Sequence, residues 1–469
     1  MITILFLTPI IFSLILFIFR SRILNNTAVI CYSLIHLAIS INLYIYGGNL
    51  QNYFQADNLN ILFLLITSLL FCGSALYGID FLKHTSTKLH THYSIFIMLF
   101  VFSLDGVVLS YHLGLLWVFV EATTLSSAFL IYFNRTKSAL EATWKYIFIC
   151  SIGIALALIG IILLGIGCKD LKSLFFNDLY NSASLIMPFW LKLSFPFILI
   201  GFGTKIGLAP VHAWLPDAHS EAPSPISALL SGALLNASFA GVLRVYKLME
   251  IAHLGIYSRI LFLIMGFMSI FVSAVFIIKI KNYKRMLAYS SIENMGIIAI
   301  GIGIGGIGLF AAMFHFIAHS LSKASLFLTS GNILHAYSSK QVDEVKDISR
   351  KLPVSGWLWM LGFLSISAFP PFSTFISEFL IIKAMFEKNH IITAVCFMFL
   401  LTIIIAAAGK SFLSMYFSGE KSDYSTEKEN FLSYFPQIIF LSISLLLGLF
   451  MPDFLINILN NMVNAITKL

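Results

Sequence analysis

Apolar segments of about 20 residues recur along the whole sequence, and each is long enough to cross the roughly 30 Å hydrocarbon layer of a membrane. Of the 469 residues, 59% are hydrophobic and 11% are charged. Soluble domains, in contrast, carry about 25% charged residues. Such a chain buries its apolar segments in lipid instead of folding around one soluble core. The sequence therefore predicts an all-α, polytopic membrane protein.

We expect about 14 transmembrane helices from the length of these segments. The predicted spans are 3–19, 25–46, 58–79, 93–110, 112–133, 143–167, 188–217, 224–248, 257–279, 286–306, 307–332, 355–385, 390–415 and 433–451. The segment that follows, 452–467, has the character of an interfacial helix.

Prolines lie inside the seventh and twelfth spans, at Pro210 and Pro216 in one and at Pro370 and Pro371 in the other. Proline removes a backbone N–H and strains a helix, and a break at membrane depth must face protein or water. We therefore expect both spans to consist of two half-helices.

The two broken helices lie five spans apart, which indicates an internal repeat of helices 4–8 and 9–13. Because five is an odd number, the second copy would be inverted in the membrane, as in many transporters. This divides the chain into helices 1–3 (residues 1–92), the first repeat (93–250), the second repeat (251–416), and a loop with helix 14 and the C-terminal tail (417–469).

Lysine and arginine concentrate in the loops that follow odd-numbered spans, for example at Arg20, Lys83, Lys284 and Arg350. By the positive-inside rule these loops are cytoplasmic and both termini lie outside. The net charge of +8 reflects mainly this bias. No basic cluster with interleaved aromatic residues indicates a nucleic-acid partner. The five cysteines are scattered without metal-ligand spacing, so we expect no metal or cofactor in this chain.

Three charged residues lie near mid-depth in separate spans, where a charge is costly and therefore a candidate functional group. Glu121 is in the middle of the fifth span, Lys205 precedes the break in the seventh, and Glu378 follows the break in the twelfth. A buried carboxyl and a buried lysine form a site whose proton occupancy depends on their separation and hydration. The alternatives are a hydrogen-bonded structural glutamate, a static ion pair, and an interfacial position for Glu378.

His315, His319 and Lys323 recur every four residues in FHFIAHSLSKASLF, residues 314–327. On an α-helix each step turns about 40° and rises about 6 Å, so the three groups form a slanted ladder about 12 Å long. Histidine exchanges protons readily near neutral pH, which favours a proton relay with bridging waters. Metal binding by the two histidines is an alternative that the Lys323 charge disfavours, and packing histidines bonded to Ser320 or backbone are another.

A further group of polar residues has structural explanations at least as good as functional ones. Glu141 and Lys145 fit a pair at a helix end as well as a site of proton uptake. Arg244 can extend to the membrane surface from span eight. Lys410 lies within or at the end of span thirteen, and Asp105 lies toward the end of span four, where water can reach it.

Two further segments contain auxiliary candidates. The segment HAWLPDAHSEAPSP, residues 212–225, contains Asp217 and His219, and we expect it to form a hydrogen-bonded loop or a proton mouth. Glu293 lies about two turns into span ten.

Three blocks of sequence resemble the signatures of a known family. They are GTKIGLAPVHAWLPDAHSEAPSPISALLSG (203–232), YKRMLAYSSIENMG (283–296) and HSLSKASLFL (319–328). They resemble the antiporter-like family, which contains the proton-pumping membrane subunits of respiratory complex I, the large subunits of Mrp cation/proton antiporters, and their equivalents in membrane-bound hydrogenases. The resemblance covers residues 90–450, and WVFVEATTLSSAFLIY (117–132) makes it greatest for the hydrogenase-4 component F group.

The resemblance implies roles for the buried charges. It implies that Glu121 and Lys205 are the key pair of helices 5 and 7, that the ladder is the central proton relay, and that Glu378 is the terminal charged residue of helix 12. Where complex I relatives usually place lysine or histidine in helix 8, this sequence has Asn236. Asparagine positions water but does not carry a proton.

The resemblance further implies a proton-translocating subunit of a redox-driven complex in the bacterial cytoplasmic membrane, of the hydrogenase-4 or NADH:quinone oxidoreductase type. The chemistry would then belong to other membrane subunits and to soluble subunits with iron–sulfur clusters, and this chain would hold no cofactor and catalyse no reaction itself. The alternatives are an Mrp-like antiporter that exchanges Na⁺ or K⁺ for H⁺, an energy-coupling partner in a bicarbonate-accumulating complex, and a scaffold that has lost transport.

Overall fold

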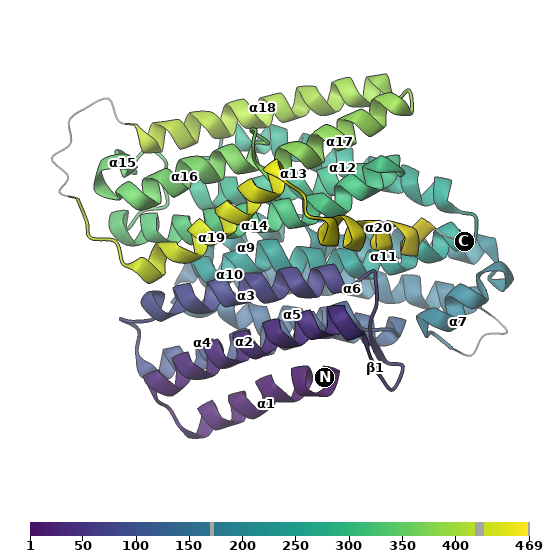
Figure 1. Ribbon diagram of the computed structural model, residues 1–469, viewed down its shortest axis with the longest axis horizontal. Coiled ribbons are helices and arrows are strands. Elements are labelled where there is room, and N and C mark those ends of the chain that lie inside the picture. The colour runs from purple at the N-terminus through teal and green to yellow at the C-terminus, as the bar shows by residue number, and fades with distance from the viewer. Residues whose placement is uncertain (169–172, 418–425, 468–469) are drawn as a thin grey trace.

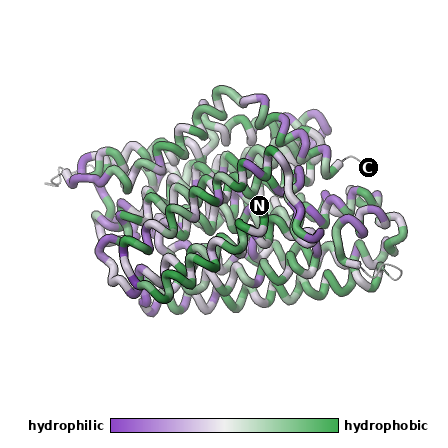
Figure 2. The backbone as a smooth tube through the Cα atoms, turned by 60° about the horizontal axis from the view of Figure 1, so that its bottom comes forward, coloured by the Kyte–Doolittle hydropathy of each residue, from purple (hydrophilic) through white to green (hydrophobic). Residues whose placement is uncertain are grey.

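The computed structural model describes residues 1–168, 173–417 and 426–467 as a bundle of helices that lie side by side along its long axis (Figure 1). Hydrophobic residues occupy the middle of these helices and hydrophilic residues gather near their ends (Figure 2). The predicted all-α polytopic fold is therefore confirmed.

Within these described residues, twelve helical segments are long and apolar enough to cross a membrane. They are α2 (Arg22–Tyr46), α3 (Ile61–Phe81), α4 (Thr87–Leu109), α5 (Leu113–Ile131) with the 3₁₀ turn η1 (Tyr132–Asn134), α6 (Lys137–Gly167), α8 (Pro188–Ile206), α10 (Ser224–Leu229) continuing through the π-helical turn η3 (Leu230–Leu234) into α11 (Leu235–Ile251), α12 (Gly255–Ile277), α13 (Tyr283–Ile304), α14 (Ile307–Tyr337), α18 (Ile391–Tyr416) and α19 (Phe431–Leu449).

Shorter helices occupy the other segments predicted to span. These are α1 (Ile2–Ile18), with 17 residues, and the pair α16 (Pro353–Ile366) and α17 (Ser373–Glu387), with 14 and 15. The small elements are α7 (Phe176–Asn181), the 3₁₀ turn η2 (Ala183–Leu185), α9 (Trp214–Glu221), α15 (Ile348–Lys351) and the antiparallel hairpin of β1 (Gly48–Leu50) and β2 (Phe54–Ala56).

Both predicted breaks are present. The first break separates α8 from α9, and Gly207, with φ 79°, ends α8 in a left-handed conformation. The second lies between α16 and α17, around Pro370 and Pro371. Backbone groups freed by the first break find partners, because the Trp214 indole donates to the Thr204 carbonyl at 2.6 Å and the Ala209 N–H donates to Ser269 at 2.9 Å.

One local prediction is wrong. The segment 212–225 is not a loop, since most of it forms α9 and the start of α10. The predicted C-terminal helix is present as α20 (Asp453–Thr467), which contacts α11 and α14 and buries Leu455 and Leu459.

Basic residues gather at one end of the bundle. The loop between α1 and α2 carries Arg20, the loop between α3 and α4 carries Lys83, and α15 carries Arg350 and Lys351. We call this the basic end, on the left of Figure 1, while the hairpin and α7 lie at the opposite end. The segment α10–α11, α13 and α14 are the most completely buried spans, so they form the centre of the bundle.

Candidate functional site

Lys205 lies on the last turn of α8, directly before the break, and its side chain is fully buried. Its Nζ donates to the hydroxyl of Tyr146 on α6 at 2.7 Å and lies 4.5 Å from the centre of that ring. Tyr146 in turn shares a 2.6 Å hydrogen bond with Ser127 of α5. The ion pairs within 4.0 Å among the described residues do not include Lys205. This lysine therefore binds a neutral hydroxyl instead of a carboxylate.

Glu121 is half-buried on α5, and its carboxylate accepts long hydrogen bonds from Thr124 at 3.3 Å and from Ser151 of α6 at 3.4 Å. The charge of Glu121 still acts on Lys205, although the two do not touch. The predicted pair thus shares one region, with α6 providing hydrogen-bond partners to both side chains.

The three residues of the ladder are fully buried on α14. His315 connects two neighbouring helices, because Nδ1 lies 2.8 Å from Ser377 Oγ of α17 and Nε2 lies 3.0 Å from Asn294 Oδ1 of α13. The amide of Asn294 is oriented by its bond to the Ser290 carbonyl at 2.7 Å, so its oxygen faces the ring. An amide oxygen only accepts, so Nε2 of His315 carries a hydrogen and Nδ1 remains free to gain or lose one.

His319 follows one turn later, and neither of its ring nitrogens makes a hydrogen bond to another described residue. Buried polar atoms normally have partners, so a buried imidazole of this kind indicates hydration. Within the described ranges, no group of three His, Cys, Asp or Glu side chains is placed to hold a metal ion.

Lys323, the last member of the ladder, donates to the Leu287 carbonyl of α13 at 2.8 Å. The charge of Glu293, also buried on α13, acts on Lys323, and Glu378 on α17 faces the charge of Glu293. Glu378 is 7% exposed, so it lies inside the bundle and not at the membrane surface. Glu293, expected to be auxiliary, therefore belongs to the central group.

Asn236 follows the π-helical turn η3 on α11 and connects the two halves of the chain. Its Nδ2 donates to the Gly232 carbonyl at 2.8 Å and to Ser320 Oγ at 2.7 Å, next to His319 on α14. Its Oδ1 is buried without a hydrogen bond to any described residue. π-Helical turns often occur at functional sites, and this one leaves an amide oxygen available to water.

His219 lies on α9 between the ladder and the basic end. It is fully buried, and its ring stacks on Phe327 of α14 at 4.8 Å between centroids. The charges of both Lys284 and Lys323 reach it. Lys284 donates to the Ala222 carbonyl at 2.7 Å and lines a cavity of 440 Å³ at the basic end.

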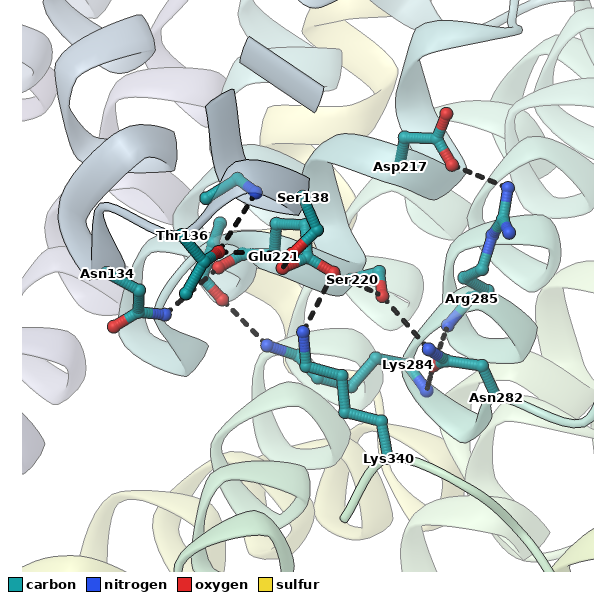
Figure 3. Close-up of polar contacts among 12 residues, drawn as sticks. Asn134, Thr136, Ser138, Asp217, Ser220, Glu221, Asn282, Lys284, Arg285 and Lys340 are labelled. Atoms are coloured by element: carbon teal, nitrogen blue, oxygen red, sulfur yellow. Dashed lines mark hydrogen bonds and ion pairs between the residues drawn. The ribbon is translucent and has the colours of Figure 1, made fainter. Parts of the chain in front are cut away.

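Glu221, at the end of α9, also lines this cavity and joins three segments (Figure 3). It accepts from Lys340 at 2.8 Å and from Ser138 of α6 at 3.0 Å. Burial on its own raises the pKa of Glu221, but Lys340, Ser138 and the charge of Lys284 together outweigh burial and hold this pKa below its usual value. The group is therefore an ionised carboxylate at neutral pH.

Of the other auxiliary candidates, Lys145 is half-exposed at the basic end and bonds Glu141 at 2.6 Å and Asp217 at 3.1 Å, while Arg285 bonds Asp217 at 2.5 Å (Figure 3). Glu141 and Lys145 therefore form the ion pair that their spacing of four residues allowed. Lys410 is exposed on α18.

The expectation that Arg244 extends to the surface is wrong. Arg244 is buried on α11, where it pairs with Asp57 at 2.9 Å and lies over the ring of Tyr111 at 4.9 Å. Asp57, on the loop before α3, pairs with Nη1 of the guanidinium, while Nη2 is buried without a hydrogen bond to a described residue.

Sequence reasoning missed the neutral partners of the buried charges: Tyr146, Asn294 and Ser377. A weak signal was present, because Asn294 follows Ser290, and Ser377 follows Ser373, at a spacing of four residues that places each pair on one helix face.

Comparisons with known proteins find similar membrane subunits. The family described as NADH:quinone oxidoreductase/Mrp antiporter, TM, matches residues 110–404. The hydrogenase-4 component F homolog of Methylacidiphilum infernorum (isolate V4) is 34% identical over 401 residues, which cover 83% of this chain and 84% of that protein. Hydrogenase-4 component B of Escherichia coli (strain K12) is 29% identical over 72% of this chain, and the match spans 51% of that longer protein.

Two solved structures have the same fold. A chain of the membrane-bound sulfane sulfur reductase, an archaeal respiratory membrane complex, matches with a TM-score of 0.89 and 21% identity, covering 99% of this chain and 97% of that one. A chain of the Mrp complex from Dietzia sp. DQ12-45-1b matches with a TM-score of 0.89 and 17% identity, at the same coverage.

Proposed function

The chain belongs to the family of NADH:quinone oxidoreductase and Mrp antiporter membrane subunits, and from this we propose that it translocates protons as one membrane subunit of a larger, redox-driven complex. The proposed proton-carrying side chains are Glu121, Lys205, His315, His319, Lys323 and Glu378. The observation that carries the proposal is that Lys205 and Lys323 are fully buried yet bind neutral oxygen atoms, Tyr146 Oη and the Leu287 carbonyl.

A lysine held by a neutral acceptor can be charged or uncharged without breaking an ion pair. An ammonium group at this depth is costly unless a carboxylate approaches or water enters. Glu121 stands near Lys205 and Glu293 near Lys323 without direct contact. A small change in either separation would therefore shift a proton to or from the lysine, which is the elementary step of the proposed transport.

Within this proposal, Asn236 replaces a titratable residue between Lys205 and the ladder. Its amide binds Ser320 and leaves Oδ1 for a water molecule, and His319 has two unbonded ring nitrogens next to Ser320. Proton transfer across this point would therefore pass through water.

We propose that helices 4–8 and 9–13 act as two inverted copies, residues 93–250 and 251–416, each with one carboxylate–lysine pair. The buried Glu293 on α13 occupies in the second copy the place that Glu121 on α5 occupies in the first, because span ten corresponds to span five. The breaks between α8 and α9 and between α16 and α17 take corresponding places as well.

Protons would reach the ladder from the basic end, which the distribution of lysine and arginine makes cytoplasmic. The 440 Å³ cavity contains Lys284 and Glu221, and the fully buried His219 lies between Lys284 and Lys323. We place the protein in the bacterial cytoplasmic membrane with both termini outside.

The relatives support one type of complex over the others. The similarity to a hydrogenase-4 component F homolog over most of both chains favours a hydrogenase-like complex. Its other membrane subunits would then connect this chain to soluble subunits that carry iron–sulfur clusters. The fold match to an Mrp complex keeps exchange of Na⁺ or K⁺ for H⁺ as the second candidate, and coupling to a bicarbonate-accumulating enzyme is the third.

The test is proton movement in membrane vesicles that contain the intact complex, with dye-reported acidification as the readout. We expect Glu121→Gln and Lys205→Ala to abolish coupled proton movement, and Lys323→Ala to do the same. The matched control is Lys192→Ala, because Lys192 lies on the same helix as Lys205 but faces outward. Normal acidification in both Glu121→Gln and Lys205→Ala, with normal amounts of protein, would refute the proposal. Acidification that requires Na⁺ and no electron donor would move it to the antiporter.

A further inference from the structure

A second buried titratable pair lies outside the proposed proton axis, among the first four helices. His36 on α2 and Asp105 on α4 approach to 2.8 Å between Nε2 and Oδ1, with side chains that are 0% and 1% exposed. Tyr32 places its hydroxyl 3.5 Å from the other oxygen of Asp105. The expectation that water reaches Asp105 directly from the end of span four is therefore wrong.

The hydrogen bonds around His36 allow two arrangements of its protons. Ser68 on α3 lies 2.7 Å from Nδ1, and its single hydroxyl hydrogen has further acceptors in the Leu64 carbonyl at 2.8 Å and Ser40 at 2.6 Å. Nδ1 donates to Ser68 when that hydrogen goes to one of the two oxygens, and it accepts from Ser68 otherwise, in which case the imidazole hydrogen is on Nε2. Nε2 then faces Asp105 either as an N–H against a carboxylate or as a lone pair against a carboxylic acid. In both cases one proton lies between the two residues, and its loss would set a lone pair against a negative charge.

The surroundings of the pair contain few other titratable groups. From α3 the nearest is Cys72, whose thiol bonds the Ser33 carbonyl at 3.3 Å, and α1 carries none. On α5, Glu121 is directed to Ser151 of α6, and on α11, Arg244 is paired with Asp57. No lysine or arginine among these contacts neutralises Asp105, so the bound proton itself balances the charge.

Unpartnered polar atoms lead from this pair to the basic end. Both ring nitrogens of His90, the Tyr93 hydroxyl and Ser94 Oγ, all on α4, are buried without hydrogen bonds to described residues, and so is Asn25 Oδ1 on α2. Buried polar atoms of this kind normally bind ordered water. A path for water between helices needs polar atoms of this kind along its length, and these atoms provide them.

Cavities follow the same path. A cavity of about 10 Å³ between α2, α3 and α4 is lined by Ser74, Gly78, His90, Tyr93 and Ser94, and a volume of about 10–15 Å³ holds one water molecule. His90 also lines a surface cavity of 300 Å³ at the basic end, together with Arg22 and Lys83. Val29 of α2 and Ile97 of α4 form the apolar part of the lining of the small cavity. Tyr32, which contacts Asp105, follows Val29 by three residues on α2, so it lies about one helical turn farther along. An apolar stretch of this kind passes water only intermittently.

We propose that His36 and Asp105 form a proton-binding site, separate from the axis of buried lysines and histidines, which exchanges its proton with the basic end through the cavity beside His90. The ligand is a single proton. A metal cation bound to Asp105 would need further oxygen ligands, and the imidazole of His36 occupies the place beside Oδ1 where one of them would lie. Release transfers the proton to water, leaves a neutral imidazole facing a carboxylate, and weakens the contact between α2 and α4.

The site is tested by pH-difference infrared spectroscopy of the purified protein, with its co-purifying subunits, in lipid. We expect a pH-dependent band, from a carboxylic-acid C=O or from a carboxylate bound to imidazolium, that is absent in Asp105→Asn, shifted in His36→Gln, and unchanged in Glu378→Gln. If Asp105→Asn gives the wild-type difference spectrum, the pair keeps its proton permanently, and the proposal is overturned in favour of a structural clamp. Because His36→Gln keeps a hydrogen-bonding side chain, its shifted band tests the pair even if Asp105→Asn does not assemble.

Access through the cavity is tested separately by the rate at which this band shifts on transfer to D₂O. Gly78→Ala places a methyl group in the small cavity, where the added Cβ meets no atom within 4 Å, so the fold tolerates it. We expect exchange to slow several-fold in Gly78→Ala. The matched control is Gly165→Ala, another helical glycine whose added Cβ meets no atom within 4 Å, on α6. Equal exchange rates in the two variants would overturn the proposed path.

Discussion

Buried charges in this protein are stabilised mostly by uncharged neighbours. Lys205 depends on the Tyr146 hydroxyl, Lys323 on a backbone carbonyl, and His315 on an amide and a hydroxyl. A carboxylate in direct contact would hold the proton on either lysine tightly, whereas neutral partners accept both the charged and the uncharged form of a group. The chemistry of single residues is therefore suited to proton exchange and poorly suited to a static framework.

This reasoning makes Tyr146 a positioning residue for Lys205. Tyr146→Phe keeps the ring and removes only the hydroxyl that accepts from Nζ. A hydrogen bond to a charged group is worth about 1.5–3 kcal/mol, so we expect proton translocation to fall roughly tenfold or more. Acidification rates in vesicles measure this, and Tyr44→Phe, at an exposed position on α2, is the control. A normal rate in Tyr146→Phe would show that Lys205 does not use this hydroxyl.

The charged members of the candidate site could be identified from the sequence, but their partners could not. Glu121, Lys205 and Lys323 interrupt apolar segments, and a charge there is rare and costly. Tyr146 and Ser377 do not stand out, because single hydroxyl residues are common in membrane helices, where they bond to the backbone of the preceding turn. Which hydroxyl meets which charge depends on helix packing, and a single sequence does not contain that information.

At the scale of helices and turns, prolines predicted both breaks correctly, and polar composition misled the prediction for 212–225. That segment is rich in polar residues, yet it forms a helix in which Trp214, Leu215, Ala218 and His219 are among the buried residues. The helical spacing of these four residues was visible in the sequence. The loop was nevertheless predicted from polar composition, because the expected boundary of span seven, at residue 217, left too short a segment to show a helical period.

Close contact between α6 and α8 holds Lys205 against Tyr146, and it depends on glycine. A Cβ added at Gly201 would lie 2.5 Å from the Ala157 backbone nitrogen and 2.7 Å from the Gly153 carbonyl oxygen. Backbone atoms cannot move aside as a flexible side chain can. The two helices would therefore have to separate.

We expect Gly201→Ala to lower stability by about 1–3 kcal/mol, the usual effect of overpacking, and to reduce proton translocation by displacing Lys205. Gly165→Ala, on α6, meets open space and should leave stability unchanged or raise it, by up to about 1 kcal/mol from the helix preference of alanine. Melting temperatures of the purified variants in lipid measure both effects. Equal melting temperatures for the two variants would contradict this account of the α6–α8 contact.

At the scale of the whole molecule, the all-α architecture and the apolar character of the helices followed from the sequence, because segment length and hydrophobicity are properties of single segments. Two other features could not be predicted from the sequence. One is the ion pair that lets Arg244 be buried, since Asp57 lies 187 residues away, and the other is the packing of α20 against α11 and α14. These contacts join distant parts of the chain, and only the assembled bundle determines them.

Glu221 makes long-range contacts of the same kind. Its carboxylate joins α9 to Ser138 of α6 and to Lys340, which follows α14. Its folded-state pKa lies below the usual value for glutamate, because Lys340 and Ser138 outweigh the effect of burial. A group of this kind contributes stability that is fully present above its unfolded pKa, about 4.3, and that disappears as pH falls through the lower folded pKa.

We therefore expect Glu221→Gln to be less stable than the wild type at neutral pH, by about 1–3 kcal/mol for a lost charged hydrogen bond. The difference should remain constant from pH 8 to about pH 5 and shrink at lower pH, because the wild-type carboxylate then takes up a proton and loses the same interactions. Melting temperatures of both proteins across this pH range measure it, with Glu387→Gln, a surface pair with Lys383, as the control. A difference that persists unchanged in acid would show that Glu221 acts through its shape and not its charge, so that the basic end is held together by packing instead of by this ion pair.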